Sequence, residues 1–312
     1  MLAKKGEGIH FSFEARAEQI DRELAAAFAA IPCSLQIGLQ STNQQALELV
    51  NRKTDLKLFA KRIGLLNEAG VVFGLDLMYG LPGDSLSGFR NSLDWALSLW
   101  PNNLEIFRLA VLPGTELADK ADGLGLRWQQ EAPYLVESAP QWSKADLERA
   151  GQLARACDLL YTRGRAVSWF LPAVRVLGLK PGQIFADFAV WLDCPEGRSV
   201  RKKKGMEAVL SENNPDHRLI EELQLAFFEF KYRQKECLPV FAVLQDVIRL
   251  NGAWTRALAE GLECKLDLSW HPEDLFGPGV LDLAGFAEHA CMEQCSVRIY
   301  SGPDGPDMEL VE

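Results

Sequence analysis

Short apolar runs alternate with amphipathic helical patterns over the first 120 residues, and this alternation constrains the fold more than any other feature of the chain. The strand-like runs cover residues 10–14, 34–40, 71–78 and 104–112. Strands that alternate with helices over connections of this length are parallel, with right-handed crossovers. Four such units make half of an eight-unit (βα) barrel. The sequence therefore predicts an α/β fold that begins with a partial (βα) barrel around a parallel sheet.

Capping residues mark where the predicted helices begin. Thr42 and Gln45 form a T-x-x-Q capping box, which predicts a helix start after the second strand. Thr54 is expected to cap the next helix, and Asp84 or Ser85 the helix after the third strand. Each of these helices starts shortly after a strand or another helix, as repeated βα units require.

The pattern changes after residue 122, so we expect two domains, 1–122 and 123–312. The second domain is predicted to be mostly α-helical. It ends in a predicted β-hairpin, because turn-forming residues at Pro303–Gly305 separate two strand-like runs.

The formal net charge of −10 excludes nucleic-acid binding by bulk electrostatics. The basic run Arg201–Lys204 lies in a segment, residues 193–216, that we expect to be a solvated loop. No apolar run approaches the roughly 20 residues of a membrane helix, and the N-terminus lacks the apolar segment of a signal peptide. We therefore expect no nucleic-acid partner, no membrane partner and a cytoplasmic location.

Seven cysteines are scattered along the chain. An odd, scattered set without a secretion signal indicates reduced thiols in a cytoplasm. Only Cys291 and Cys295 are close together, and we interpret this CxxxC pair as two small buried residues, since no third cysteine or histidine follows at a useful distance. No metal site is therefore predicted in this chain.

Asp76 lies in the middle of the apolar run at residues 71–78. An unpaired carboxylate in a protein core costs several kcal/mol, so a strand rarely carries one for packing alone. This residue therefore indicates a functional site next to the strand.

Three further polar residues lie at or near the ends of the predicted strands: Glu14, Gln40 and Arg52. Ligands of parallel α/β folds collect at the carboxyl ends of the strands. Arginine binds carboxylates, and aspartate or glutamate binds ribose hydroxyls or an ammonium group. A ligand with an amino-acid end and a sugar end would satisfy all four. Alternatively the four are unrelated, with Glu14 starting a helix, Arg52 lying on the surface and Asp76 capping backbone amides.

The motifs IGLQS (37–41), LVNR (49–52) and DLMYGLPG (76–83) follow one another in the order and spacing of the radical S-adenosylmethionine (SAM) superfamily. The chain resembles this family over residues 9–115. The resemblance is closest to proteins related to the oxygen-independent coproporphyrinogen oxidases and to cobalamin-binding radical SAM proteins.

The resemblance implies a role for each strand-end residue. Gln40 and Arg52 would hold the methionine part of SAM, with Arg52 on its carboxylate, and Asp76 would bind the ribose hydroxyls. Glu14 would line the same site. Two weaker candidates for the adenine pocket are Met78 and Leu112.

Members of the family hold a [4Fe–4S] cluster with three cysteines spaced CxxxCxxC, and reduction of cluster-bound SAM yields a 5′-deoxyadenosyl radical. This chain contains no CxxxCxxC. Its four strands match units three to six of the family's six-unit barrel, so the resemblance implies that the cluster loop lies upstream of Met1. Cobalamin-linked members carry a further domain upstream, which makes cobalamin an additional candidate cofactor of the parent protein.

These departures predict a fragment that is inactive alone and binds no cofactor alone. Its partners would be the upstream cluster-bearing segment, an unidentified small-molecule substrate and, through the open sheet edge, a second copy of itself. The C-terminal half resembles an uncharacterised extension of some cobalamin-linked members, and it indicates no substrate.

Two other functions remain open at this point. The chain could be a non-catalytic binding or scaffold domain that has kept the barrel fold. It could instead be an unrelated α/β enzyme of the aldolase or hydrolase type, although it contains no G-x-S-x-G, no H-E-x-x-H and no P-loop.

Overall fold

A computed structural model of the chain describes residues 9–204, 216–303 and 305–311. The chain divides into two compact units, Met1–Asp158 and Leu159–Glu312. The structural division thus lies after Asp158. The expected boundary after residue 122 marks the end of the family-like sequence pattern, and it stays a prediction.

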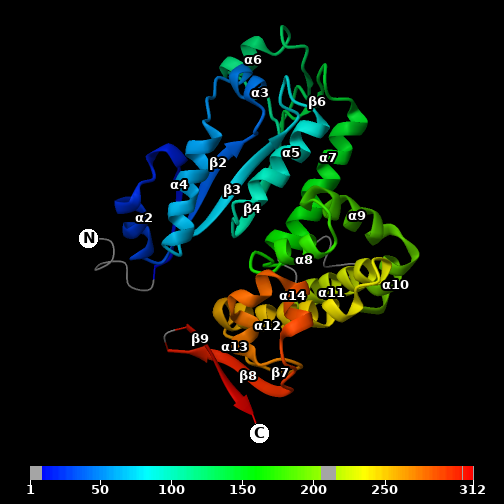
Figure 1. Cartoon of the computed structure of the whole chain (residues 1–312). Coiled ribbons are helices and arrows are strands. Elements are labelled where there is room, and N and C mark those ends of the chain that lie inside the picture. The colour runs from blue at the N-terminus through cyan, green and yellow to red at the C-terminus, as the bar shows by residue number, and fades with distance from the viewer. Residues whose placement is uncertain (1–8, 205–215, 304, 312) are drawn as a thin grey trace. The chain divides into compact units, whose positions relative to one another are not determined.

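The first unit contains a four-stranded parallel sheet, with the strands in the order β1-β2-β3-β4. Figure 1 labels β2, β3 and β4 of this sheet. The strands are β1 (Phe11–Ala15), β2 (Cys33–Gln40), β3 (Val72–Tyr79) and β4 (Asn103–Arg108). Sequential strands lie side by side, as right-handed βα units require. The parallel α/β fold predicted from the sequence is therefore confirmed, although β4 ends four residues earlier than expected.

Helices precede and follow these strands in the first unit. They are η1 (Ala17–Gln19), α2 (Arg22–Ala29), α3 (Gln44–Leu49), α4 (Leu56–Glu68), α5 (Leu86–Leu97), α6 (Glu116–Lys120) and α7 (Lys144–Cys157). A short antiparallel pair, β5 (Arg127–Trp128) and β6 (Val136–Ser138), lies between α6 and α7. Because α7 packs against α5 and β4, it belongs to the first unit.

Two of the predicted helix caps are wrong by one residue. Asn43, not Thr42, caps α3 by accepting the N–H of Ala46. Asp55, not Thr54, caps α4 by accepting two backbone N–H groups. The hydroxyl and N–H of Thr42 bond instead to Ser92 of α5. The third prediction is confirmed at Ser85, which caps α5.

One face of the parallel sheet is apolar. Its central residues Ile37, Leu39, Leu75 and Leu77 are fully buried. The inward-facing side chains of α4 and α5 are buried as well: Phe59, Ile63, Leu66, Phe89, Leu93 and Ala96. Each large side chain buried in this way contributes roughly 1.5–3 kcal/mol, so this face holds the sheet in the unit.

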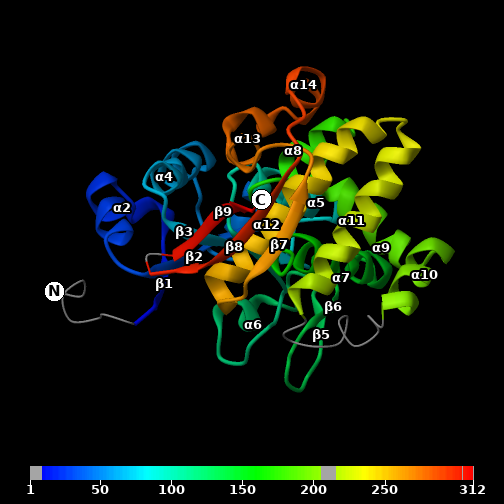
Figure 2. The same ribbon diagram turned by 90° about the horizontal axis from the view of Figure 1, so that it is seen from below.

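The second unit is mostly helical and ends in a three-stranded antiparallel sheet in the order β7-β8-β9, which confirms the predicted architecture (Figure 2). Its helices are η2 (Asp158–Thr162, whose first residue closes the first unit), α8 (Phe170–Val176), α9 (Pro181–Asp193), α10 (Pro195–Lys204), α11 (His217–Gln234), α12 (Leu238–Glu260), α13 (Pro272–Phe276), η3 (Pro278–Leu281) and α14 (Leu283–His289). Its strands are β7 (Cys264–Leu268), β8 (Cys295–Gly302) and β9 (Gly305–Val311). The α12 helix packs against all three strands.

Two local expectations in the second unit are wrong. The basic run lies in α10 rather than in a loop, because the helix that starts at Pro195 continues to Lys204. Arg201 of this helix is within 3.6 Å of the carboxylate of Asp193. Cys291 is exposed in the segment before β8, and Cys295 begins that strand, so the two do not form a buried pair. Among the described helices, none is both long and apolar enough to cross a membrane.

Candidate functional site

The second face of the parallel sheet is polar. Side chains alternate between the two faces of a strand, and the strand register places the rows of Gly74, Asp76 and Met78 on this face. Gln40 joins them through a bulge in β2, which brings its side chain over Gly38. We call it the polar face and define it by ten residues: Glu14, Gln36, Gly38, Gln40, Gly74, Asp76, Met78, Asn103, Glu105 and Phe107. It contains four of the six residues that the sequence predicted for the site.

Asp76 occupies the centre of the polar face. It lies between Gly38 of β2 and Glu105 of β4, its register partners on the two neighbouring strands. The amide of Gln36 donates a hydrogen bond to its Oδ1 atom. Partial burial raises the pKa of Asp76, and the nearby carboxylate of Glu14 raises it further. Asp76 is therefore a half-buried acceptor that faces a polar surface, not a residue of the apolar core.

Gln40 ends β2 in an unusual backbone conformation. The register slips by one residue between Gly38 and Gln40, and the φ angle of Gln40 is 68°. This left-handed conformation costs a non-glycine residue roughly 1–2 kcal/mol, and bulges of this kind re-aim side chains next to functional sites. The side chain of Gln40 returns over Gly38, where a Cβ added to the glycine would lie 2.7 Å from the Nε2 atom of Gln40.

Arg52 reaches the same position from the end of α3. Its backbone N–H donates to the carbonyl of Leu47 at 2.8 Å, which fixes the chain just after the helix. Its guanidinium Nη1 atom lies 3.4 Å from the Cβ position of Gly38. Its positive charge lowers the pKa of Asp76, against the larger effect of burial. The structure thus brings Gln40, Arg52 and Asp76 together around Gly38.

The other three predicted residues, Glu14, Met78 and Leu112, differ in their position relative to Gln40, Arg52 and Asp76. Glu14 lies in β1 on the polar face, so the alternative that it starts a helix is wrong. Met78 lies on the same face of β3, two residues beyond Asp76. Leu112 lies four residues beyond the end of β4 and is 51% exposed, and its place at the site stays a prediction.

Sequence reasoning missed the residues in the middle of the strands. Gln36 and Gly38 of β2, Gly74 of β3 and Glu105 of β4 all lie on the polar face. Partial burial, followed by the carboxylates of Asp76 and Asp158, raises the pKa of Glu105. One sequence feature could have identified Gln36 and Gly38. Polar and apolar residues alternate with a period of two in CSLQIGLQ, and this pattern assigns both residues to the face of Gln40.

A buried polar network fixes the ends of β2 and β3 next to each other. Asp84 is 1% exposed and accepts hydrogen bonds from Ser41 at 3.0 Å and from Asn43 at 3.2 Å. Ser92 of α5 lies 3.3 Å from the Ser41 hydroxyl and completes the network. The turn after β3 passes through Gly80 at a φ of 86°, a conformation that favours glycine.

The cysteines of the described residues do not fit an iron–sulfur cluster. A cluster with one open iron needs three thiolates in one place, and the described part of the chain brings no three cysteine, histidine or acidic side chains together for a metal. Cys33 is buried at the start of β2 on the apolar face. The polar face, by contrast, offers three amides and three carboxylates, and the guanidinium of Arg52 reaches it at Gly38. These groups fit a ligand with both an amino-acid and a sugar end.

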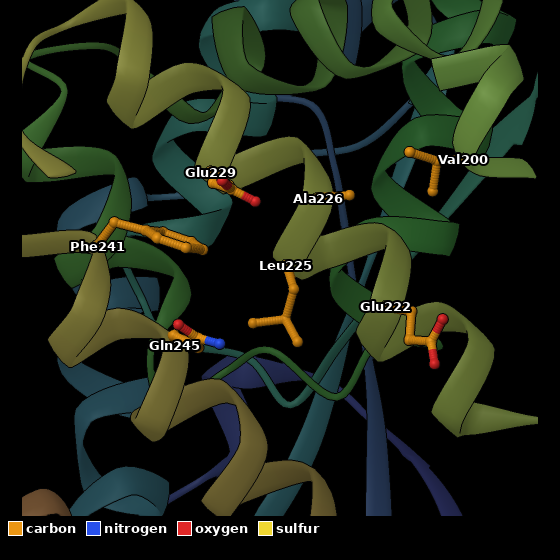
Figure 3. A pocket seen from close by; sticks show the side chains of 7 residues that line it. All are labelled: Val200, Glu222, Leu225, Ala226, Glu229, Phe241 and Gln245. Carbon is orange, nitrogen blue, oxygen red and sulfur yellow. The ribbon is translucent and has the colours of Figure 1, made fainter. Parts of the chain in front are cut away.

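Two hollows lie among the described residues of the second unit. One, of about 610 Å³, lies between α10, α11 and α12, and Figure 3 shows its mixed lining of Val200, Glu222, Leu225, Ala226, Glu229, Phe241 and Gln245. The other, of about 370 Å³, lies beside α12 and α13 and is mainly apolar. Neither combines an arginine with carboxylates, so the polar face remains the candidate site.

Residues 1–96 match the family model of the radical SAM superfamily. The oxygen-independent coproporphyrinogen III oxidase of Helicobacter pylori (strain J99 / ATCC 700824) is 29% identical over 80 residues, which are 25% of this chain and 18% of that protein. The chain thus matches less than a fifth of the length of this relative. The resemblance indicated by the strand-end motifs is confirmed for this part of the chain.

Two solved structures show a weaker likeness. The radical S-adenosylmethionine methyltransferase TsrM from Kitasatospora setae, with cobalamin and a [4Fe-4S] cluster bound, has a TM-score of 0.34 and 19% identity, covering 46% of this chain and 31% of that chain. The radical SAM enzyme HemN from Escherichia coli, a coproporphyrinogen III oxidase, has a TM-score of 0.31 and 14% identity, covering 70% and 69%. Both scores are below 0.5, so the functional assignment depends on the sequence match and the site geometry.

Proposed function

We propose, from the match of residues 1–96 to the family model of the radical SAM superfamily, that the polar face is the SAM-binding surface of a radical SAM barrel. One observation carries the proposal. The side-chain ends of Gln40 and Arg52 meet over Gly38, directly beside Asp76. An amide, a guanidinium and a carboxylate thereby converge from β2, the end of α3 and β3.

Each group has a partner in SAM. The guanidinium of Arg52 binds the carboxylate of the methionine part by paired hydrogen bonds, and the amide of Gln40 holds the same end. Asp76 accepts hydrogen bonds from the ribose hydroxyls. Glu14 lines the same site at β1, while Met78 and Leu112 border the adenine.

The cluster-bearing part of the barrel is supplied by a segment outside this chain. Among the described strands, β1 pairs on one side only, with β2, so its other edge can receive a further strand. A reduced [4Fe–4S] cluster supplies the electron that cleaves SAM and starts the radical chemistry. The sequence led us to expect no cofactor in this chain alone, but the group formed by Gln40, Arg52 and Asp76 leads us to propose that the chain alone binds SAM weakly, with millimolar affinity. We propose further that it does not perform the radical chemistry alone, and that its isolated edge also favours self-association.

For the parent protein we also propose a cobalamin domain further upstream. We propose a cytoplasmic location as well, supported by the seven cysteines, all of which are free thiols. The small-molecule substrate is unidentified.

The reading frame upstream of Met1 offers a first test. An in-frame CxxxCxxC would support the proposal. A polypeptide that includes it, reconstituted anaerobically, should bind SAM and release 5′-deoxyadenosine. A reconstituted polypeptide that binds no SAM would contradict the proposal and favour a non-catalytic domain.

The SAM-binding residues are tested in this chain itself by NMR titration, which detects millimolar affinity. We expect Arg52→Ala to weaken SAM binding at least tenfold, the effect of losing about 1.5–3 kcal/mol of hydrogen bonds to a charged group. Lys53→Ala is the matched control, because it removes a neighbouring exposed cation. Equal loss of affinity in both variants would remove Arg52 from the site.

A further inference from the structure

We infer that Gln36 is the positioning residue of the SAM site: it orients the carboxylate of Asp76 so that one oxygen is held by the protein and the other faces the ribose. The inference rests on the proposed function of the polar face. Gln36 does not touch the ligand in this assignment. It acts through Asp76 alone.

The two residues lie on neighbouring strands but not in the same row. Gln36 of β2 is the register partner of Gly74, and Asp76 is two residues further along β3. The side chain of Gln36 must therefore lie across β3 to reach Asp76, and its Nε2 atom donates to Oδ1. A long, flexible amide side chain can make this diagonal contact, whereas a shorter one cannot.

Gly74 leaves the space that this contact needs. A Cβ atom at Gly74 would overlap the Oε1 atom of Gln36 and the side-chain oxygen of Asn103. Any other residue at position 74 would push Gln36 away from the strand. A glycine in the middle of a strand weakens that strand. The path of the Gln36 side chain explains why β3 nevertheless has a glycine at position 74.

Chemistry fixes which way the amide points. An ionised carboxylate only accepts hydrogen bonds, so the Gln36 nitrogen must face Asp76 and its oxygen must face Gly74. The hydrogen bond occupies Oδ1 of Asp76, and Oδ2 is left to accept a ribose hydroxyl. The hydrogen bond thereby restricts rotation of the carboxylate about its terminal torsion angle, which otherwise has a broad distribution.

The hydrogen bond also keeps Asp76 in the form that binds a diol. Burial and the carboxylate of Glu14 favour the protonated acid, whereas the bond from Gln36 and the charge of Arg52 favour the carboxylate. Loss of the Gln36 donor therefore shifts Asp76 towards the protonated form, which donates one proton and accepts less well. Both effects weaken ribose binding.

The variant Gln36→Leu tests this inference, because it keeps the size of the side chain and removes its donor. In the chain without ligand, titration of ¹³C-labelled aspartate should show the Asp76 midpoint moving up by about one pH unit, the size expected when a charged group loses one hydrogen bond. SAM affinity at neutral pH should fall about tenfold and recover in part at higher pH. A merely structural role of Gln36 would change neither the midpoint nor this pH profile.

Ser34→Ala is the matched control. Ser34 lies on the same side of β2, one row further from Asp76, and its hydroxyl lies 3.2 Å from the ring of His10. It should leave the Asp76 midpoint and the SAM affinity unchanged. If Gln36→Leu does not fold, Gln36→Asn keeps the polarity but is too short to reach Asp76, and the same shifts are expected.

The outcomes separate this inference from the proposed function. If Asp76→Asn abolishes SAM binding while Gln36→Leu keeps the wild-type affinity and Asp76 midpoint, the positioning role is wrong and the SAM site stands. If the wild-type chain shows no saturable SAM binding, the proposed function fails and the positioning role for SAM falls with it. A shifted Asp76 midpoint would then still establish the link between the two side chains.

Discussion

Gly38 of β2 is the register partner of Asp76 of β3, and the space above this glycine is filled by the side chains of Gln40 and Arg52. The amide of Gln40 and the guanidinium of Arg52 both lie within 3.4 Å of the position that a Cβ of Gly38 would take. The residue without a side chain thus sets where the cationic and amide groups meet the carboxylate.

We predict that a larger residue at this position separates these groups. In Gly38→Val, the branched side chain displaces Gln40 and Arg52, and SAM affinity should fall at least tenfold. The free energy of unfolding should change by less than about 1 kcal/mol, because valine suits a strand. NMR titration with SAM and urea unfolding measure the two quantities.

Gly64→Ala is the control for this experiment. Gly64 lies in α4 and has no atom within 4 Å of its Cβ position. Alanine should stabilise the helix by about 1 kcal/mol without affecting SAM affinity. If Gly38→Val bound SAM as Gly64→Ala does, the meeting point of the three groups would not be the binding site.

Asp76 should lower the stability of the chain at neutral pH. Its pKa is raised in the folded chain, chiefly by burial, so the folded chain binds this proton more tightly than the unfolded chain does. Stability contributed by the protonated acid is therefore lost as the pH rises through the raised pKa. We expect Asp76→Asn to unfold at higher urea concentration than the wild type at pH 7. At acidic pH the side chain at position 76 is neutral in both the wild type and the variant. If the difference in urea midpoint persisted unchanged there, the effect would come from packing and not from the charge of Asp76.

A buried histidine in the second unit should make stability fall with acid. Arg256 donates to Nδ1 of His217 at 3.1 Å, so the other ring nitrogen carries the hydrogen and lies 3.4 Å from the carbonyl of Gly164. Arg256 is also paired with Glu221 at 2.5 Å. Burial, followed by the charge of Arg165, lowers the pKa of His217 to about 4.

Because this pKa lies below the ordinary value of 6.5, the neutral imidazole stabilises the unit fully above that value and progressively less as the pH falls towards 4. The loss amounts to about 3 kcal/mol at most. Urea unfolding of His217→Gln, whose amide can replace both hydrogen bonds, should lack this part of the pH dependence. His289→Gln, at an exposed position, should retain it, and a wild-type-like acid loss in His217→Gln would refute the assignment.

The buried network at the strand ends should be the most sensitive polar feature of the first unit. In Asp84→Ala, the hydroxyl of Ser41 loses its carboxylate acceptor inside the protein, whereas the amide of Asn43 keeps the carbonyl of Gly83. We expect a loss of about 1–3 kcal/mol, the cost of a buried donor left unsatisfied. Asp119→Ala, which changes an exposed residue of α6, should alter the urea midpoint little. Similar midpoints for both variants would show that the network carries no stability.

The sequence was sufficient to predict the parallel sheet, and it selected the segments whose polar residues the structure brings together. Apolar runs and cap residues located β1 to β4 within a few residues, and strand-end chemistry selected Gln40, Arg52 and Asp76. Helix caps were missed by one residue, because the competing bonds of Thr42 with Ser92 depend on the tertiary structure.

The interior of the site could not be predicted in the same way. Gln36 and Gly74 matter because the register brings them together across two strands, and register is not a local property of the sequence. The sequence also failed to predict the basic helix α10, because a run of hydrophilic residues is typical of a solvated loop. The ion pair between Arg201 of this helix and Asp193 is visible only in the structure. Leu112 was selected only through the family resemblance, and its role stays a prediction.

The central claim is tested most directly by titrating SAM into the ¹⁵N-labelled chain and following the backbone amide signals. Saturable shifts at Gly38, Gln40 and Arg52, with a dissociation constant in the millimolar range and loss of the effect in Asp76→Asn, are the predicted result. Shifts that do not saturate, or that are confined to residues 159–311, would contradict a SAM site on the polar face.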